Sequence, residues 1–189
     1  MDDIEATVRE FLKTTNINDI CNEAELQFEL ALFIKENLRG SRIYLERSCE
    51  KFNIKDRLIK KEIDLVVQRD DGSFSAIELK YPKNGRVPET MYDFIKDIKF
   101  LEQLSESKNF KRNFFLAITG DKGFWKGESN RIYAYFRGGE NLPSNKPIYK
   151  PTGPEKGSES ISLNAQYSIS WELIPSSNPE MKFLLIRVN

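Results

Sequence analysis

Residues 62–81, EIDLVVQRDDGSFSAIELKY, contain the pattern on which the prediction of the fold depends. The segments Glu62–Gln68 and Phe74–Tyr81 are short, largely apolar and bounded by turn residues, as is typical of strands. Between them lies Asp70-Asp71-Gly72-Ser73, whose Asp-Gly pair is characteristic of a tight hairpin turn. The stretch therefore predicts two neighbouring antiparallel strands.

On both sides of this hairpin, some segments have the periodicity of helices and others that of strands. One predicted helix covers residues 22–39, with Asn22 as its N-cap and Gly40 at its end. The other predicted elements are a short helix at 2–14, a helix at 89–107, and strands at Arg42–Ser48, Asn113–Thr119, Arg131–Phe136, Gln166–Ile174 and Met181–Val188.

This order of elements predicts a single α/β domain over residues 1–189, built on one mixed sheet flanked by helices. The expected core covers about residues 20–136, in the order α-β-β-β-α-β. Residues 137–160 are rich in Gly, Pro, Ser, Asn and Lys and predict a long loop. Residues 161–189 are expected to add closing strands.

Histidine is absent from the 189 residues, which excludes several classes of enzyme. Ser-His-Asp hydrolases, Cys-His proteases and HExxH metalloproteases all depend on it. The two cysteines, Cys21 and Cys49, are too few for a disulfide framework and make a structural zinc site improbable. Any catalysis would therefore use carboxylates, lysine, tyrosine or a hard metal ion such as Mg²⁺.

The charge balance and hydropathy limit the expected partners. Basic and acidic residues number 29 each, so the protein does not coat nucleic acid through bulk positive charge, and a local basic patch would be needed. No stretch approaches the roughly 18 apolar residues of a membrane span, and the N-terminus lacks an apolar signal core. We expect a reduced, cytoplasmic setting and no membrane partner.

Three charged residues lie within the predicted hairpin. Asp64 belongs to an otherwise apolar strand, where an unpaired carboxylate is costly to bury. Side chains alternate along a strand, so Glu78 and Lys80 point to the same face. If the strands pair, Asp64 adjoins them, and two carboxylates with an ammonium group could hold a divalent ion and act on a phosphate. The alternatives are a solvated Asp64 and a surface ion pair between Glu78 and Lys80.

The spacing Asp64-x(13)-Glu78-Leu79-Lys80 resembles the D-x(n)-(D/E)-x-K signature of the PD-(D/E)XK, or restriction-endonuclease-like, nucleases. The phrases EIDLVV and AIELKY and the element order over residues 22–119 fit this family, although no proline precedes Asp64. The resemblance implies a restriction-endonuclease-like core with Asp64, Glu78 and Lys80 as catalytic residues and Asp64 and Glu78 as metal ligands. It also implies Mg²⁺, for which Mn²⁺ can substitute, and is compatible with a homodimer.

The family usually adds a glutamate from the first core helix. Glu23, Glu25 and Glu29 are the candidates. Glu25 is explained as the capping-box partner of Asn22, and Glu29 as a solvated helix residue. Glu23 is spaced three, seven and eleven residues before apolar positions and so falls on the core-facing stripe of the helix. We therefore expect Glu23 to be the additional catalytic residue and metal ligand, with Glu25 as the second choice.

Four basic residues follow the hairpin and could contact phosphates: Lys83, Arg86, Lys96 and Lys99. A charge-mixed helix face explains the four residues equally well. Asp93 and Asp97 are spaced i, i+4 around Lys96 and could tune the site from the helix, but a solvated face is the favoured interpretation for both.

The sequence thus predicts a Mg²⁺-dependent hydrolase that cleaves phosphodiester bonds of nucleic acid, with DNA as the expected substrate, using a metal-activated water. The alternative is a catalytically inactive nuclease-fold protein that binds nucleic acid or regulates another protein. A plain interaction domain is the third hypothesis, but it leaves the buried acids unexplained.

Overall fold

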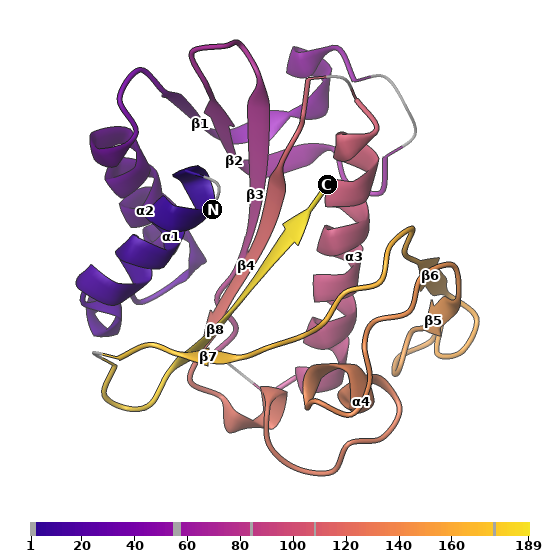
Figure 1. The fold of residues 1–189 in the computed structure, drawn as a ribbon. Helices are drawn as coiled ribbons and strands as arrows, with labels where there is room; N and C mark the ends of the chain where they lie inside the picture. The colour runs from indigo at the N-terminus through magenta and orange to yellow at the C-terminus, as the bar shows by residue number, and fades with distance from the viewer. Residues whose placement is uncertain (1–2, 55–57, 84, 108, 176) are drawn as a thin grey trace.

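The computed structural model describes residues 3–54, 58–83, 85–107, 109–175 and 177–189 (Figure 1). Six strands form one mixed sheet in the order β1-β2-β3-β4-β8-β7. Their bounds are β1 Arg42–Ser48, β2 Glu62–Gln68, β3 Phe74–Lys80, β4 Asn113–Thr119, β7 Glu172–Leu173 and β8 Lys182–Val188. The predicted α/β class with a mixed, helix-flanked sheet is confirmed.

The predicted hairpin of β2 and β3 is confirmed, and the two strands are the second and third of the sheet. The two strands pair antiparallel, with Leu65 opposite Ile77 and Gln68 opposite Phe74. The turn closes through a hydrogen bond from the amide of Gly72 to the carbonyl of Arg69, at 2.9 Å. Gly72 has φ +79°, a conformation that glycine adopts at little cost.

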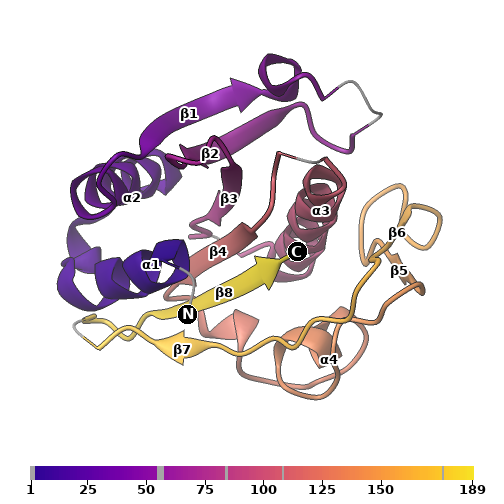
Figure 2. The same ribbon diagram turned by 45° about the horizontal axis from the view of Figure 1, so that its top comes forward.

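Helices cover both faces of the sheet (Figure 2). α1 (Asp3–Thr14) and α2 (Glu23–Asn37) pack on one face, where Leu65, Ile77 and Leu79 belong to their apolar cluster. α3 (Val87–Ser105) covers the other face, where Ala76 and Val66 belong to its cluster. The alternation of side chains along β2 and β3 therefore supplies two separate cores.

α3 is the crossover that makes β3 and β4 parallel. Its ten buried residues include Met91, Phe94 and Ile98, which recur at helical spacing. One consequence is functional: a helix placed over the same face as Glu78 can send polar side chains toward the end of β3.

Two strand predictions in the C-terminal half were wrong. Residues 131–136 do not form a strand; Ile132–Phe136 form the short helix α4. β4 already pairs with β3 on one side and β8 on the other, so no sheet position remains beside it. The segment instead satisfies its backbone locally, as in the bond from the amide of Arg137 to the carbonyl of Tyr133, at 2.9 Å.

Within the predicted strand Gln166–Ile174, only Glu172–Leu173 join the main sheet, as β7 beside β8. Tyr167 makes an isolated bridge to Leu142. The predicted long loop at 137–160 contains β5 (Pro147–Tyr149), which pairs with β6 (Ser160–Ser162) in a small separate hairpin. Short 3-10 helices lie at Ile17–Asp19, Cys49–Phe52 and Lys122–Phe124. Across the described ranges, no helix is long and apolar enough to cross a membrane.

Candidate functional site

The registered pairing of β2 with β3 ends one residue short of Asp64 on β2 and Glu78 on β3. The last registered pair is Leu65 with Ile77, and beyond it side chains replace the backbone ladder. The amide of Leu79 donates to Oδ2 of Asp64 at 2.8 Å, and the amide of Asp64 donates to Oε1 of Glu78 at 3.2 Å. Each carboxylate thus accepts a hydrogen bond from a backbone amide of the neighbouring strand, at the point where the registered pairing stops.

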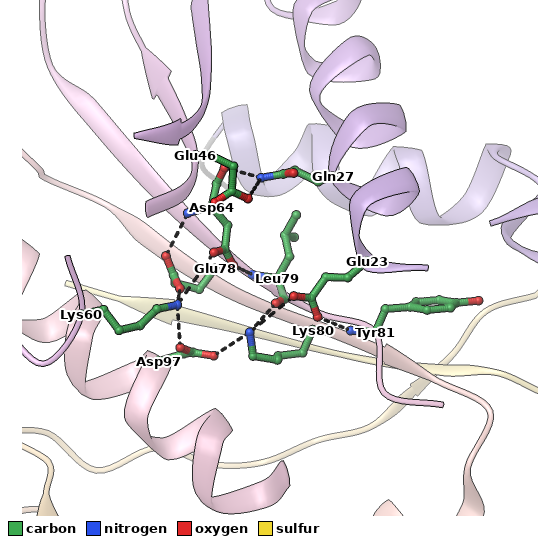
Figure 3. Close-up of polar contacts among 10 residues, drawn as sticks. All are labelled: Glu23, Gln27, Glu46, Lys60, Asp64, Glu78, Leu79, Lys80, Tyr81 and Asp97. Atoms are coloured by element: carbon green, nitrogen blue, oxygen red, sulfur yellow. Dashed lines mark hydrogen bonds and ion pairs between the residues drawn. The ribbon is translucent and has the colours of Figure 1, made fainter. Parts of the chain in front are cut away.

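Lys60 places a positive charge between these carboxylates (Figure 3). Its ammonium donates to Oε2 of Glu78, lies 2.9 Å from Oδ1 of Asp97, and lies 3.8 Å from Oδ1 of Asp64. Glu78 has an exposed fraction of 0%, so this contact neutralises a carboxylate that water does not reach.

Asp97, on α3, joins the two lysines of the site. Its other oxygen, Oδ2, lies 3.2 Å from the ammonium of Lys80. Lys80 also donates to the carbonyl of Leu79 at 2.9 Å. The expectation that Asp97 belongs to a solvated face was wrong: Asp97 is buried, whereas Asp93, on the same helix, is exposed.

Glu23 approaches the site from the first turn of α2. Its Oε2 accepts a hydrogen bond from the amide of Tyr81 at 3.0 Å, and its Oε1 lies 3.7 Å from the ammonium of Lys80. The side chain is 47% exposed, so it reaches the end of β3 from the solvent side and not from the core-facing stripe.

The competing glutamates of α2 have other positions. Glu25 accepts a hydrogen bond from the amide of Cys21, while its own amide donates to Oδ1 of Asn22 at 2.8 Å, which is the helix cap that the sequence indicates. Glu29 is exposed on α2.

A cavity of about 240 Å³ opens beside Asp64, on the side of α2. It is lined by Glu23, Ala24, Gln27, Glu46, Asp64 and Leu79. Gln27 joins the strands here, because its amide donates to the carbonyl of Asp64 at 2.6 Å and to Oε1 of Glu46 at 2.8 Å. Glu46 belongs to β1, between residues that pair with Leu65 and Ile63, and has φ +47°, a strained conformation for a non-glycine residue.

Burial and charge shift the ionisation of the site. Burial, together with the charge of Asp64, raises the pKa of Glu78 well above its ordinary value, and Lys60 opposes this shift. Burial lowers the pKa of Lys60, but Glu78, Asp97 and Asp64 outweigh it and raise that pKa. Burial also lowers the pKa of Lys80, but the charges of Asp97 and Glu23 outweigh it, so that this pKa is raised as well. Both lysines are therefore cations at neutral pH.

The four basic residues with expected phosphate contacts fall into two groups. Lys83 and Arg86 are exposed between β3 and α3, and Lys83 lines a cavity of about 630 Å³ near Thr119. Lys96 lies 3.2 Å from Glu159, and Lys99 lies 3.2 Å from Glu102. The last two already have acidic partners within the chain.

In the part of the chain that the structure describes, no three His, Cys, Asp or Glu side chains form a group that could hold a metal ion. The pair of Asp64 and Glu78 still fits Mg²⁺, which is held in proteins by one or two carboxylates and keeps several waters. The fit rests on the donor atoms, which are all hard oxygens, and on the Lys60 ammonium, which shows that those oxygens already surround a positive charge.

The sequence did not single out Lys60, and for Asp97 it favoured a solvated face. Lys60 precedes β2 in a charged stretch, Lys60-Lys61-Glu62, that resembles an ordinary solvated segment. Asp97 could have been found, because it lies between Phe94, Ile98 and Leu101 on the buried stripe of its helix.

Comparison with known proteins adds nothing to this picture. No protein-family model, curated protein or solved structure matches the chain.

Proposed function

We propose that this chain is a Mg²⁺-dependent nuclease of the PD-(D/E)XK type that hydrolyses phosphodiester bonds in DNA. The observation that carries the proposal is the placement of Asp64 and the fully buried Glu78 around one positive charge, with Lys80 on the adjoining stretch of β3. A chain with no use for a cation here would gain nothing from two converging carboxylates, because their repulsion and desolvation are costly.

Each residue has a distinct role in this proposal. Asp64 and Glu78 hold the ion. Glu23, whose carboxylate lies beside Lys80 and the amide of Tyr81, would have to turn toward the ion to complete the site from α2. When bound, the ion stabilises charge on the phosphate and lowers the pKa of a coordinated water. Lys80, positioned by Asp97 and the carbonyl of Leu79, orients the attacking water or offsets the charge that develops on the phosphate.

The proposed DNA path passes the end of β3. Lys83 and Arg86 are exposed there, and cationic side chains at such positions bind phosphates without reading the base sequence. Lys96 and Lys99 would need to leave Glu159 and Glu102 to take part, so the first two residues are the better candidates.

One observation favours a second candidate, a nuclease-fold protein that binds nucleic acid without cleaving it. Lys60 contacts three carboxylates of the site, and a site kept closed by lysine would have no turnover. The two candidates differ in metal binding: only the enzyme needs a divalent ion at Asp64 and Glu78.

The deciding experiment measures cleavage of plasmid, linear, branched and single-stranded DNA, and of RNA, with Mg²⁺, Mn²⁺ or EDTA. We expect cleavage of DNA that requires the divalent ion and is lost in Asp64→Asn. Glu62→Gln is the matched control, because Glu62 is exposed at the start of the same strand. DNA binding without cleavage in either metal would support the second candidate and overturn the first.

A further inference from the structure

We propose that Lys60 is a tethered cation that occupies the ion position between Asp64 and Glu78 and is displaced when the divalent metal binds. This inference rests on the proposed function, since it concerns regulation of the same site. It assigns to Lys60 a role in setting metal affinity, distinct from that of Lys80.

The contacts of the Lys60 ammonium are those expected of a bound cation. It reaches carboxylate oxygens from three different segments of the chain: Glu78 on β3, Asp97 on α3 at 2.9 Å, and Asp64 on β2 at 3.8 Å. Figure 3 shows the side chain entering the site from the opposite side to Glu23. An ordinary surface lysine has a single acidic partner, whereas Lys60 has three.

The backbone beside Lys60 is anchored, so the ammonium is directed into the site. The amide of Ile59 donates to Oε1 of Gln103 on α3 at 2.9 Å. The ammonium also lies 5.5 Å from the ring centre of Phe100, within the range of a cation–π contact.

The ammonium can nevertheless leave the site. Its side chain is 29% exposed, so the site has a path to solvent along the lysine stem. A lysine head on a flexible four-carbon stem can withdraw into water while its backbone stays in place.

Electrostatics explains why the chain would carry such a cation. Without a positive charge, the repulsion between Asp64 and the buried Glu78 would be uncompensated. Lys60 supplies that charge in the metal-free protein. A divalent ion carries twice the charge and approaches oxygen to about 2.0–2.1 Å, so it can replace the ammonium.

Lys80 is arranged differently. Its ammonium lies with Asp97, Glu23 and the carbonyl of Leu79, at the outer end of β3. Metal binding at Asp64 and Glu78 would leave the contacts of Lys80 with Asp97 and the carbonyl of Leu79 intact. Lys60 therefore yields to the ion, and Lys80 stays to act on the phosphate.

The test is Mn²⁺ affinity at neutral pH, measured by calorimetry on the full chain. Lys60→Met keeps the length of the side chain and removes the competing charge, so its Mn²⁺ affinity should rise by about fivefold or more, the lower end of typical coupling between two ligands. Lys60→Arg keeps the charge and should not tighten binding. Lys61→Met, at the exposed neighbouring position, removes the same charge outside the site and should match wild type.

A second measurement uses the wild-type protein and does not depend on the folding of a variant. Saturating Mn²⁺ should increase acylation of Lys60 by an amine-reactive reagent, followed by mass spectrometry, because the displaced ammonium enters solvent. Lys61 should show no change. Unchanged labelling of Lys60 in protein that has bound Mn²⁺ would overturn the proposal.

The outcomes separate this inference from the proposed function. Equal Mn²⁺ affinity of wild type and Lys60→Met would overturn the role of Lys60 and leave the nuclease proposal standing. Absence of Mn²⁺ binding in both would overturn both. Binding only in Lys60→Met would support the tethered cation and show that the wild-type site is closed by its own lysine.

Discussion

The backbone amide of Asp64 donates a hydrogen bond to the side chain of Glu78, 3.2 Å away, just where the ladder between their strands stops. The Asp64 carboxylate in turn accepts from the amide of Leu79 at 2.8 Å. These acids therefore have two roles, since each satisfies a backbone group and presents its second oxygen to a cation. A substitution that tests catalysis must keep the first role and remove the second.

Asp64→Asn meets this requirement, because its amide oxygen can still accept from Leu79. We expect DNA cleavage to fall by about 10²-fold or more, the loss expected when several kcal/mol of metal-dependent stabilisation is removed. DNA binding should stay equal or tighten, since a negative charge near the phosphate is gone. Single-turnover cleavage and a binding titration check this; a folded Asp64→Asn protein that cleaves at the wild-type rate would contradict the nuclease proposal.

Lys80→Ala should remove catalysis but keep metal binding, whereas Asp64→Asn removes the charge of a metal ligand. The ammonium is a charge and proton partner and is not a metal ligand, so cleavage should be lost while Mn²⁺ affinity is retained. Asp97 loses one of its two cationic partners but keeps Lys60. Parallel cleavage assays and Mn²⁺ titrations measure the two effects. Loss of metal binding in this variant would show that Lys80 supports the site structurally.

The central part of the fold could be predicted from sequence because its signals are local. Short apolar segments and the Asp-Asp-Gly turn predicted β2 and β3, and helical spacing predicted α2 and α3 within two residues of their ends. Residues 131–136 were misassigned because Ile132, Ala134 and Phe136 are buried at alternate positions, as in a strand, although the segment is a short helix. Both positions beside β4 are taken by β3 and β8, and this depends on the tertiary structure, which no local sequence pattern specifies.

The candidate site divides in the same way. Asp64, Glu78 and Lys80 lie in strands whose pairing follows from the hairpin, so their proximity could be predicted. Lys60 and Asp97 reach the site through the path of the segment before β2 and the docking of α3, both of which depend on three-dimensional packing. The signal for Asp97, an acid on an apolar stripe, was present in the sequence.

The assignment of Glu23 can be tested against Glu29 on the same helix. Glu23→Gln keeps an acceptor for the amide of Tyr81 and removes the negative charge near Lys80. We expect weaker Mn²⁺ binding in Glu23→Gln and no change in Glu29→Gln, whose side chain is exposed. Calorimetric titrations of the two variants measure the difference. Equal affinities would restrict the ion to Asp64 and Glu78.

Glu102 provides a test of the fold that is independent of metal. It is 3% exposed on α3 and accepts hydrogen bonds from the amides of Asn164 and Ala165, each at 2.9 Å, and from the hydroxyl of Tyr167 at 3.0 Å. One carboxylate thus attaches the C-terminal segment to the helix that also carries Asp97. In Glu102→Gln an amide group would face these donors where an oxygen now accepts, and hydrogen bonds to a charged group contribute about 1.5–3 kcal/mol.

We therefore expect Glu102→Gln to lower the free energy of unfolding by about 2 kcal/mol, and Tm by roughly 4–8 °C for a chain of this size. Glu106→Gln is the matched control, because Glu106 is exposed one turn later and contacts Asn164 only through a 3.3 Å bond. Thermal unfolding in EDTA measures both variants. Equal melting temperatures would show that α3 is held by its apolar face alone. A lower Tm with unchanged Mn²⁺ affinity would show that the end of α3 stabilises the fold without shaping the cation site.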